Sequence, residues 1–139
     1  MRKIVLSIVL ITVFGCAQKV DTKDLHFLNG YWEIKEVRFL DGATKTYEVN
    51  PMVEYIKLDS LQGYRKKVNP KFDGTYTATD DAELFTVLVK EDKLILMYKN
   101  SMSEWTEELQ TLSKTQFSIR NAEGFTYTYQ RFTPINSKE

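Results

Sequence analysis

The sequence predicts an all-β domain, an antiparallel up-and-down meander that closes into a barrel of roughly 8–10 strands after a short N-terminal helical turn. Segments rich in Thr, Val, Ile, Tyr and Phe follow one another from Tyr31 to the C-terminal region. Short turn signals separate these segments, and alternate positions of successive segments form one aromatic face. The length of 139 residues suits one domain.

A short helical turn is expected over residues 24–30, because Gly30 stops a helix at this point. Asp41-Gly42 and Asp73-Gly74 predict tight hairpin turns, since both residue types tolerate the positive φ that such turns require. The segments between turn signals predict strands at 31–40, 43–49, 53–59, 63–69, 74–79, 83–90, 93–99, 103–112, 115–120 and 124–132.

Short connections also predict which residues face one another across neighbouring strands. A two-residue turn at 91–92 pairs Phe85 with Tyr98, and a connection at 100–103 places Trp105 beside Tyr98. Three-residue loops at 112–114 and 121–123 carry the same face onward, with these expected pairs: Leu109 with Phe117, Ile119 with Phe125, and Phe117 with Tyr127.

One face of five successive strands is therefore apolar and must be buried, in a sandwich or in a closed barrel. Short turns without Greek-key crossovers favour closure, which removes both sheet edges. In the first strand the apolar positions change parity between Ile34 and Val37, so a β-bulge is expected near Lys35-Glu36. The expected inward face is Phe85, Val87, Leu96, Tyr98, Trp105, Leu109, Phe117, Ile119, Phe125, Tyr127 and Tyr129.

Charge and composition exclude several classes of function. The 19 basic and 19 acidic side chains cancel, which argues against nucleic acid as a partner because phosphate binding needs an excess of Lys and Arg. A single cysteine excludes an internal disulfide and a Cys-rich zinc site, and a single histidine excludes a multi-histidine metal site. No cofactor or metal is expected.

The first sixteen residues have the pattern of an exported protein. Arg2 and Lys3 precede an apolar run too short to span a bilayer, and the run ends in Val13-Phe14-Gly15-Cys16. This ending resembles the lipobox of bacterial lipoproteins, although Phe14 departs from the usual small or aliphatic residue. The alternatives are an ordinary signal peptide with an incidental cysteine, or a buried N-terminal strand. The expected organisation is a signal peptide at 1–15, a flexible tether at 16–24 and the barrel at 25–139.

The lipobox resemblance implies that Cys16 is acylated and holds the mature protein on a membrane. Ala17 follows the cysteine where inner-membrane retention signals usually carry Asp, so the resemblance implies the outer membrane. A periplasmic and a cell-surface orientation both remain open, as does the identity of a protein partner.

Two motifs at opposite ends of the domain resemble those of the lipocalin-like (calycin) barrels. Gly30-Tyr31-Trp32 is a G-x-W tripeptide at the start of the first strand, and Arg131 lies near the end of the last strand. The resemblance implies that these strands are neighbours and that Arg131 covers Trp32, with Gly30, Trp32 and Arg131 closing the barrel. Together with the lipobox, the chain resembles the small lipocalin-like lipoproteins of Bacteroidetes-type bacteria.

The interior of the predicted barrel supplies the candidate site. Glu107 falls on the inward face, where a carboxylate is costly unless it is paired. The basic segment 63–68 sends either Arg65 and Lys67, or Lys66, to the interior, so an inward cation could meet Glu107 or the carboxylate of an amphipathic ligand. A solvated rim is the alternative. The candidate ligand-binding residues are Arg65, Lys67, Phe85, Tyr98, Trp105, Glu107, Phe117, Tyr127 and Tyr129.

The expected function is that of a non-enzymatic, lipid-anchored barrel that binds a small apolar or amphipathic molecule. No nucleophile–base pair is visible, and His26 is expected to be structural or solvated rather than a ligand. The acidic residues Asp80, Asp81 and Glu83 lack the spacing of a calcium loop. The alternative is a barrel with a packed interior that acts as an accessory, scaffold or inhibitor subunit through its outer face or loops.

Overall fold

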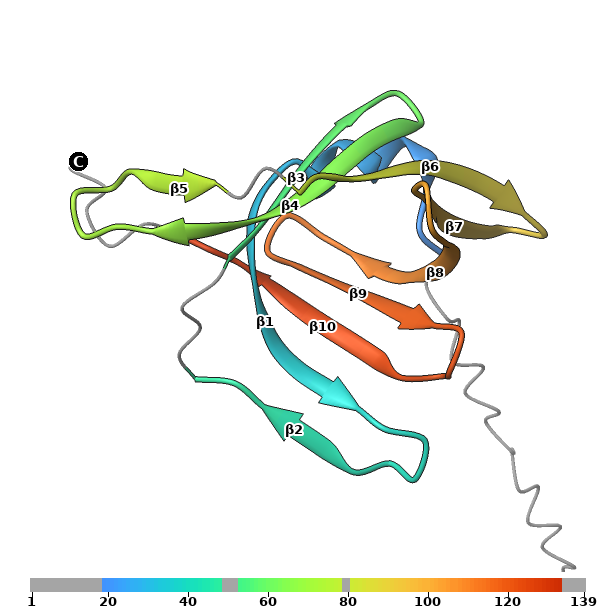
Figure 1. Cartoon of the computed structure of the whole chain (residues 1–139). Coiled ribbons are helices and arrows are strands. Elements are labelled where there is room, and N and C mark those ends of the chain that lie inside the picture. Colours follow the sequence, from blue (N-terminus) through green and yellow to red (C-terminus); the bar gives the residue numbers. More distant parts are fainter. Residues whose placement is uncertain (1–18, 49–52, 79–80, 134–139) are drawn as a thin grey trace, which may run out of the picture.

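The computed structural model describes residues 19–48, 53–78 and 81–133, which form ten strands and one short 3-10 helix (Figure 1). Cys16 and the expected signal peptide lie outside these residues. Each expected strand is present, with end points that differ by no more than three residues. The elements are η1 (Thr22–Leu28), β1 (Gly30–Arg38), β2 (Thr44–Thr46), β3 (Val53–Asp59), β4 (Gln62–Pro70), β5 (Tyr76–Ala78), β6 (Glu83–Lys90), β7 (Lys93–Lys99), β8 (Glu104–Leu112), β9 (Gln116–Asn121) and β10 (Thr126–Arg131).

Eight of these strands form a closed antiparallel barrel in the order β1-β3-β4-β6-β7-β8-β9-β10, with β10 paired back to β1. The two remaining strands extend this sheet, β2 along β1 and β5 along β4, and the β4–β5 hairpin projects to one side in Figure 1. The expected up-and-down barrel is confirmed. Closure pairs both sides of every barrel strand and thereby removes the exposed edges.

Three of the hairpin loops share one geometry, a three-residue loop that ends in a glycine. In the β1–β2 loop the Phe39 amide donates to Ala43 O, and the Gly42 amide donates to Phe39 O. The same bonds recur around Gly74 and Gly124, and φ lies between 84° and 86° at all three glycines. Glycine is needed there because other residues rarely adopt this left-handed conformation.

The expectation of positive φ at Asp41 and Asp73 is wrong. Among the described residues with positive φ other than glycine are Ser60, Glu91 and Asp92, and neither aspartate of the Asp-Gly pairs is one of them. Asp41 Oδ1 instead accepts the Ala43 amide at 2.9 Å, which holds the loop from its side chain. The two-residue turn with two positive φ values is the one at 91–92.

The expected register is confirmed from β6 to β8 and is shifted beyond it. Phe85 pairs with Tyr98, and Tyr98 pairs with Trp105. Phe117 pairs with Leu112 and with Tyr129, however, not with Leu109 and Tyr127.

Two local features cause this shift. The stretch between the paired residues of the β8–β9 hairpin covers 113–116 rather than 112–114, and the β9–β10 loop ends at Gly124 rather than before it. A bulge in β8 between Leu109 and Thr111 offsets one residue of the first change. The bulge lets Leu109 and Leu112 both pack on the core, three positions apart, and the net shift of two residues keeps the aromatic side chains on the inner face. The bulge expected in β1 is confirmed between Ile34 and Glu36.

Helix η1 covers one end of the barrel, which we name the closed end. Asp21 caps the helix, and Leu25 and Leu28 are buried under it. The helix begins at Thr22, inside the segment 16–24 that was expected to be a flexible tether. Val20 already packs against the core, and Lys19 Nζ lies 3.1 Å from the Asp92 carboxylate. The barrel domain therefore makes contacts from residue 19 onward.

Arg131 joins the last strand to the helix and the first strand at the closed end. Its guanidinium carbon lies 3.9 Å from the centre of the Trp32 ring, and its nitrogens donate to the carbonyls of Phe27, Asn29 and Lys114 at 2.5–3.0 Å. Trp32 Nε1 donates to Leu28 O at 2.8 Å, so the indole N–H, like the guanidinium, has a hydrogen-bond acceptor. The expected stacking of Arg131 on Trp32 is confirmed.

Gly30 is required by this closure for two reasons. Its φ is 124°, and a Cβ at this position would lie 2.5 Å from Arg131 Nη1. A side chain would therefore both strain the backbone and displace the guanidinium from its carbonyl partners.

We expect Arg131→Ala to lower the free energy of unfolding by about 1–3 kcal/mol, through lost stacking and unpaired carbonyls. Gly30→Ala should also destabilise, but its cost should be smaller in the Arg131→Ala background because the clash disappears. Urea unfolding of the four proteins measures both effects. Arg38→Ala, whose side chain is 64 % exposed, is the matched control and should change little. Additive costs for Gly30 and Arg131 would contradict the steric link between them.

Candidate functional site

A buried arginine occupies the barrel interior above the aromatic core. Arg65 lies on β4, opposite Ile56 of β3, and alternation along β4 turns its side chain inward. Only 6 % of the residue is exposed. Burial of a guanidinium is costly unless its donors are paired, so the groups around it define the site.

Four side chains from four other strands surround the Arg65 guanidinium. Nη1 donates to the Tyr98 hydroxyl at 3.0 Å, and Nη2 donates to the Tyr129 hydroxyl at 3.2 Å. Two carboxylates lie slightly farther away, Glu107 at 3.4 Å from Nη1 and Glu54 at 3.5 Å from Nε. We call these five residues the Arg65 cluster.

The charges of the cluster depend on burial and on pairing. Burial disfavours the charged guanidinium, but its tyrosine and glutamate partners together hold the pKa of Arg65 above its ordinary value. Burial raises the pKa of the Glu107 carboxyl, against the opposing effects of Arg65 and of a hydrogen bond from Tyr98. Burial likewise raises the pKa of both tyrosines, so each hydroxyl stays protonated and able to donate. The cluster therefore combines a permanent cation with a carboxyl that protonates more readily than usual.

A column of stacked groups connects the Arg65 cluster to the closed end. From Arg131 the column passes through Trp32 and Phe117, which meet edge to face at 4.7 Å. Phe117 then stacks on Tyr129 at 4.8 Å, and the Tyr129 ring lies 5.4 Å from the Arg65 guanidinium carbon. Side chains thus fill the barrel between Arg131 and Arg65.

Beyond the Arg65 cluster the barrel opens at the end opposite η1, which we name the open end. A cavity of about 260 Å³ lies there, lined by Glu54, Arg65, Lys66, Lys67, Asp81 and Glu83. Its lining is charged, and Arg65 is the buried residue among those that line it. The site can therefore receive a small polar group, and its volume is below the roughly 300–1,000 Å³ of drug-sized sites.

The residues predicted from the sequence lie in three different settings. Arg65, Tyr98, Glu107 and Tyr129 meet in the cluster, which satisfies the expectation that an inward cation meets Glu107. Three others lie close to it or at the opening. Phe85 contacts the Tyr98 ring at 5.5 Å, Trp105 stacks on that ring at 5.2 Å, and Lys67 is exposed at the cavity.

Two predicted residues lie away from the cavity lining. Phe117 is fully buried within the aromatic column. Tyr127 is half-buried, and its hydroxyl lies 3.5 Å from Asn121 Nδ2. Lys66, the other cation considered for the interior, places its Nζ 5.6 Å from the Tyr64 ring.

Sequence reasoning missed Glu54. The signal was present, because Glu54, Ile56 and Leu58 alternate along β3 and the two apolar residues are buried. Alternation turns Glu107 of β8 toward the barrel interior, and the same alternation turns Glu54 of β3 inward. Its partner across the pair is Lys67, so β3 and β4 each contribute charged groups to the opening.

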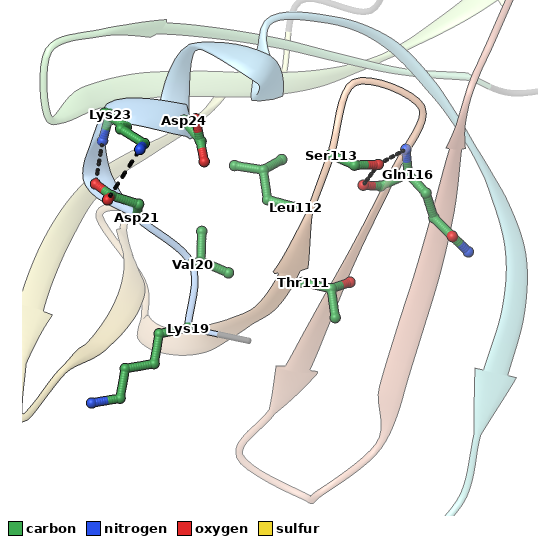
Figure 2. A pocket seen from close by; sticks show the side chains of 9 residues that line it. All are labelled: Lys19, Val20, Asp21, Lys23, Asp24, Thr111, Leu112, Ser113 and Gln116. Carbon is green, nitrogen blue, oxygen red and sulfur yellow. Dashed lines mark hydrogen bonds and ion pairs between the residues drawn. The ribbon is translucent and has the colours of Figure 1, made fainter. Parts of the chain in front are cut away.

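A larger hollow of about 680 Å³ lies outside the barrel, beside the closed end. Figure 2 shows the segment before η1 on one side of it and the β8–β9 hairpin on the other. Polar groups here are engaged locally, Lys23 with Asp21 and the Ser113 hydroxyl with Gln116. This hollow contains none of the residues predicted to bind a ligand.

The described residues contain no group of three or more side chains placed to hold a metal ion. His26 Nδ1 lies 2.9 Å from Lys23 O within η1. Nor does the described part of the chain contain a helix with the length and apolar character that crossing a bilayer requires.

No protein-family model and no curated protein matches the sequence. Among solved structures, the chain is similar to a lipocalin-like protein from Bacteroides uniformis, with a TM-score of 0.47 and 14 % identity over 76 % of this chain and 99 % of that one. An uncharacterized protein from Bacteroides eggerthii gives the same values. Apocrustacyanin C1 gives a TM-score of 0.48 and 12 % identity, over 84 % of this chain and 67 % of that one. The closed antiparallel barrel itself is defined by the strand pairing, with η1 and the contact of Arg131 with Trp32 at its closed end.

Glu107 should make stability depend on pH in a defined direction. Because its folded-state pKa is raised, the folded chain binds more protons at Glu107 than the unfolded chain does, so stability falls as pH rises through that window. We expect wild type to lose stability relative to Glu107→Gln as the pH rises above about 4, the ordinary pKa of a glutamate carboxyl. Urea unfolding at several pH values measures the difference, and a gap that widens in favour of wild type would contradict the assignment.

Proposed function

We propose that the chain is a lipid-anchored, non-enzymatic barrel that binds a small amphipathic molecule at its open end. The observation that carries this proposal is the Arg65 guanidinium, buried in the interior yet lining the cavity at the opening. A planar guanidinium with several donors suits a planar, oxygen-rich polar group. The mouths of β-barrels are among the places where small-molecule sites form.

The size of the cavity limits the ligand. About 260 Å³ admits a small molecule, or the polar end of a longer one, and the packed column below leaves the ligand no deeper route. Apolar surface near the cluster is supplied by Trp105, which is half-buried and stacked on Tyr98. An amphipathic ligand would place its polar group on Arg65 and its apolar part toward this ring and the opening.

A second function, that of an accessory or inhibitor subunit, is favoured by apolar side chains at the tips of three connections. Leu40, Phe72 and Met102 are 72–92 % exposed, and each lies in a short loop between strands. On the outer face Leu88 is 40 % exposed and lies opposite Ile95. Apolar side chains that lie side by side on the outside of a protein are typical of contact surfaces, and Leu88 and the half-buried Ile95 are such neighbours.

Binding of octanoate tests the primary proposal, because this short fatty acid joins a carboxylate to an apolar tail. We expect calorimetry to detect octanoate binding to the wild-type chain, while octanol, which lacks the charge, binds at least about tenfold more weakly. Arg65→Lys should weaken octanoate binding by a similar factor, since an ammonium cannot replace the fork of donors.

Arg38→Lys is the matched control, since Arg38 lies on the outer surface, and its affinity for octanoate should equal that of wild type. Absence of octanoate binding to a folded wild-type chain would contradict the proposal. Equal binding of octanoate and octanol would contradict the role of Arg65.

Membrane attachment is tested separately. In the host cell, Cys16→Ala should abolish acylation and release the protein from the membrane fraction, because the acyl chains supply the anchor. Metabolic labelling with a fatty acid and fractionation measure the two effects. Unchanged labelling and fractionation would rule out Cys16 as the attachment site.

A further inference from the structure

The two carboxylates of the Arg65 cluster hold the guanidinium loosely. Glu107 reaches Nη1 with one oxygen at 3.4 Å, and Glu54 reaches Nε with one oxygen at 3.5 Å. Paired carboxylates usually approach a guanidinium to about 2.7–2.9 Å, often through two parallel bonds. Neither glutamate therefore makes the short, two-bond contact that is the strongest interaction open to the Arg65 guanidinium.

We propose that the ligand's polar group is a carboxylate, and that on binding it takes the place of Glu107 on Arg65 while Glu107 accepts a proton from solvent. This inference rests on the proposed function and names the ligand class of the same site. The step is a proton transfer: an O–H bond forms on Glu107 and one breaks on the solvent or buffer acid that gives up the proton. One anion and one proton enter together, so the net charge of the site stays the same.

The charges around Glu107 explain why a proton must accompany the ligand. Arg65 of β4 is the buried cation in contact with Glu107, whereas Glu54 of β3 and Glu83 of β6 add negative charge. Lys66 and Lys67 also line the cavity, but both are more exposed than Arg65. Tyr98 of β7 donates a hydrogen bond to the carboxylate, and Asn121 of β9 lies opposite on the neighbouring strand. Tyr129 of β10 faces the same guanidinium. A third carboxylate beside one buried cation would leave uncompensated charge, which is expensive inside a protein.

Glu107 is the group best placed to take this proton. Its side chain is 13 % exposed, compared with 19 % for Glu54, and a single contact links it to Arg65. Burial already raises its pKa, and loss of Arg65 as a partner would raise it further. Protonated Glu107 can also donate a hydrogen bond, to the ligand or to a neighbouring oxygen.

The experiment is calorimetry of octanoate binding to the full chain at about pH 7.5, repeated in buffers with different ionisation enthalpies. We expect wild type to take up close to one proton per octanoate bound, and to bind more tightly as the pH is lowered. Glu107→Gln is a permanently neutral mimic, so it should bind octanoate at least about tenfold more tightly with proton uptake near zero. Glu108→Gln, which changes the next residue on the outer face, is the matched control and should behave as wild type.

The outcomes separate the two proposals. Octanoate binding without proton uptake, or a Glu107→Gln affinity equal to that of wild type, overturns the exchange and leaves the binding site standing. Failure of octanoate to bind either folded protein overturns both proposals. If Glu107→Gln does not fold, judged by circular dichroism, the buffer series on wild type decides the question alone.

Discussion

Arg131 binds the last strand of the barrel to its beginning, and the rest of the structure depends on that contact. The guanidinium covers Trp32 and donates to carbonyls of η1 and of the β8–β9 turn, so one side chain connects three separate parts of the chain. The space it occupies exists because Gly30 has no side chain. Without the pairing of β1 with β10, both strands would be sheet edges and the aromatic face would have no enclosed interior.

The barrel interior divides into two regions with different physical properties. The region near η1 is apolar and closely packed around Trp32 and Phe117, and burial there supplies stability. The region near the open end surrounds Arg65 with hydroxyls and carboxylates, where each charge costs free energy unless it is compensated. Tyr129 belongs to both regions, because its ring stacks on Phe117 and its hydroxyl binds Arg65. A change in the polar region can thus reach the apolar core through the single ring of Tyr129.

Much of this arrangement follows from alternation and turn length alone. The strands are predictable from the turn signals, and the bulge in β1 from the change of parity between Ile34 and Val37. The pairing of β6, β7 and β8 is predictable from the short connections between them. The register beyond β8 is not, since the β8–β9 and β9–β10 loops each admit more than one length. The bulge at Leu109 does leave a mark, because the core-facing positions change parity between Leu109 and Leu112. Gly42, Gly74 and Gly124 all take the left-handed position at the end of a loop, so the glycine marks that position whether or not an aspartate precedes it. Glu54 shows that charged residues at inward positions must be sought on every strand.

The closing bonds of Arg131 join residues that are 102 and 104 positions apart along the chain. A polypeptide that emerges from a ribosome or a translocation channel N-terminus first must therefore expose β1 for almost the whole time of its emergence. Its free backbone groups can pair with another strand until the final segment arrives. Contacts this distant in sequence make the assembly of such a barrel slow relative to local hairpins, and they make β10 indispensable to a closed molecule.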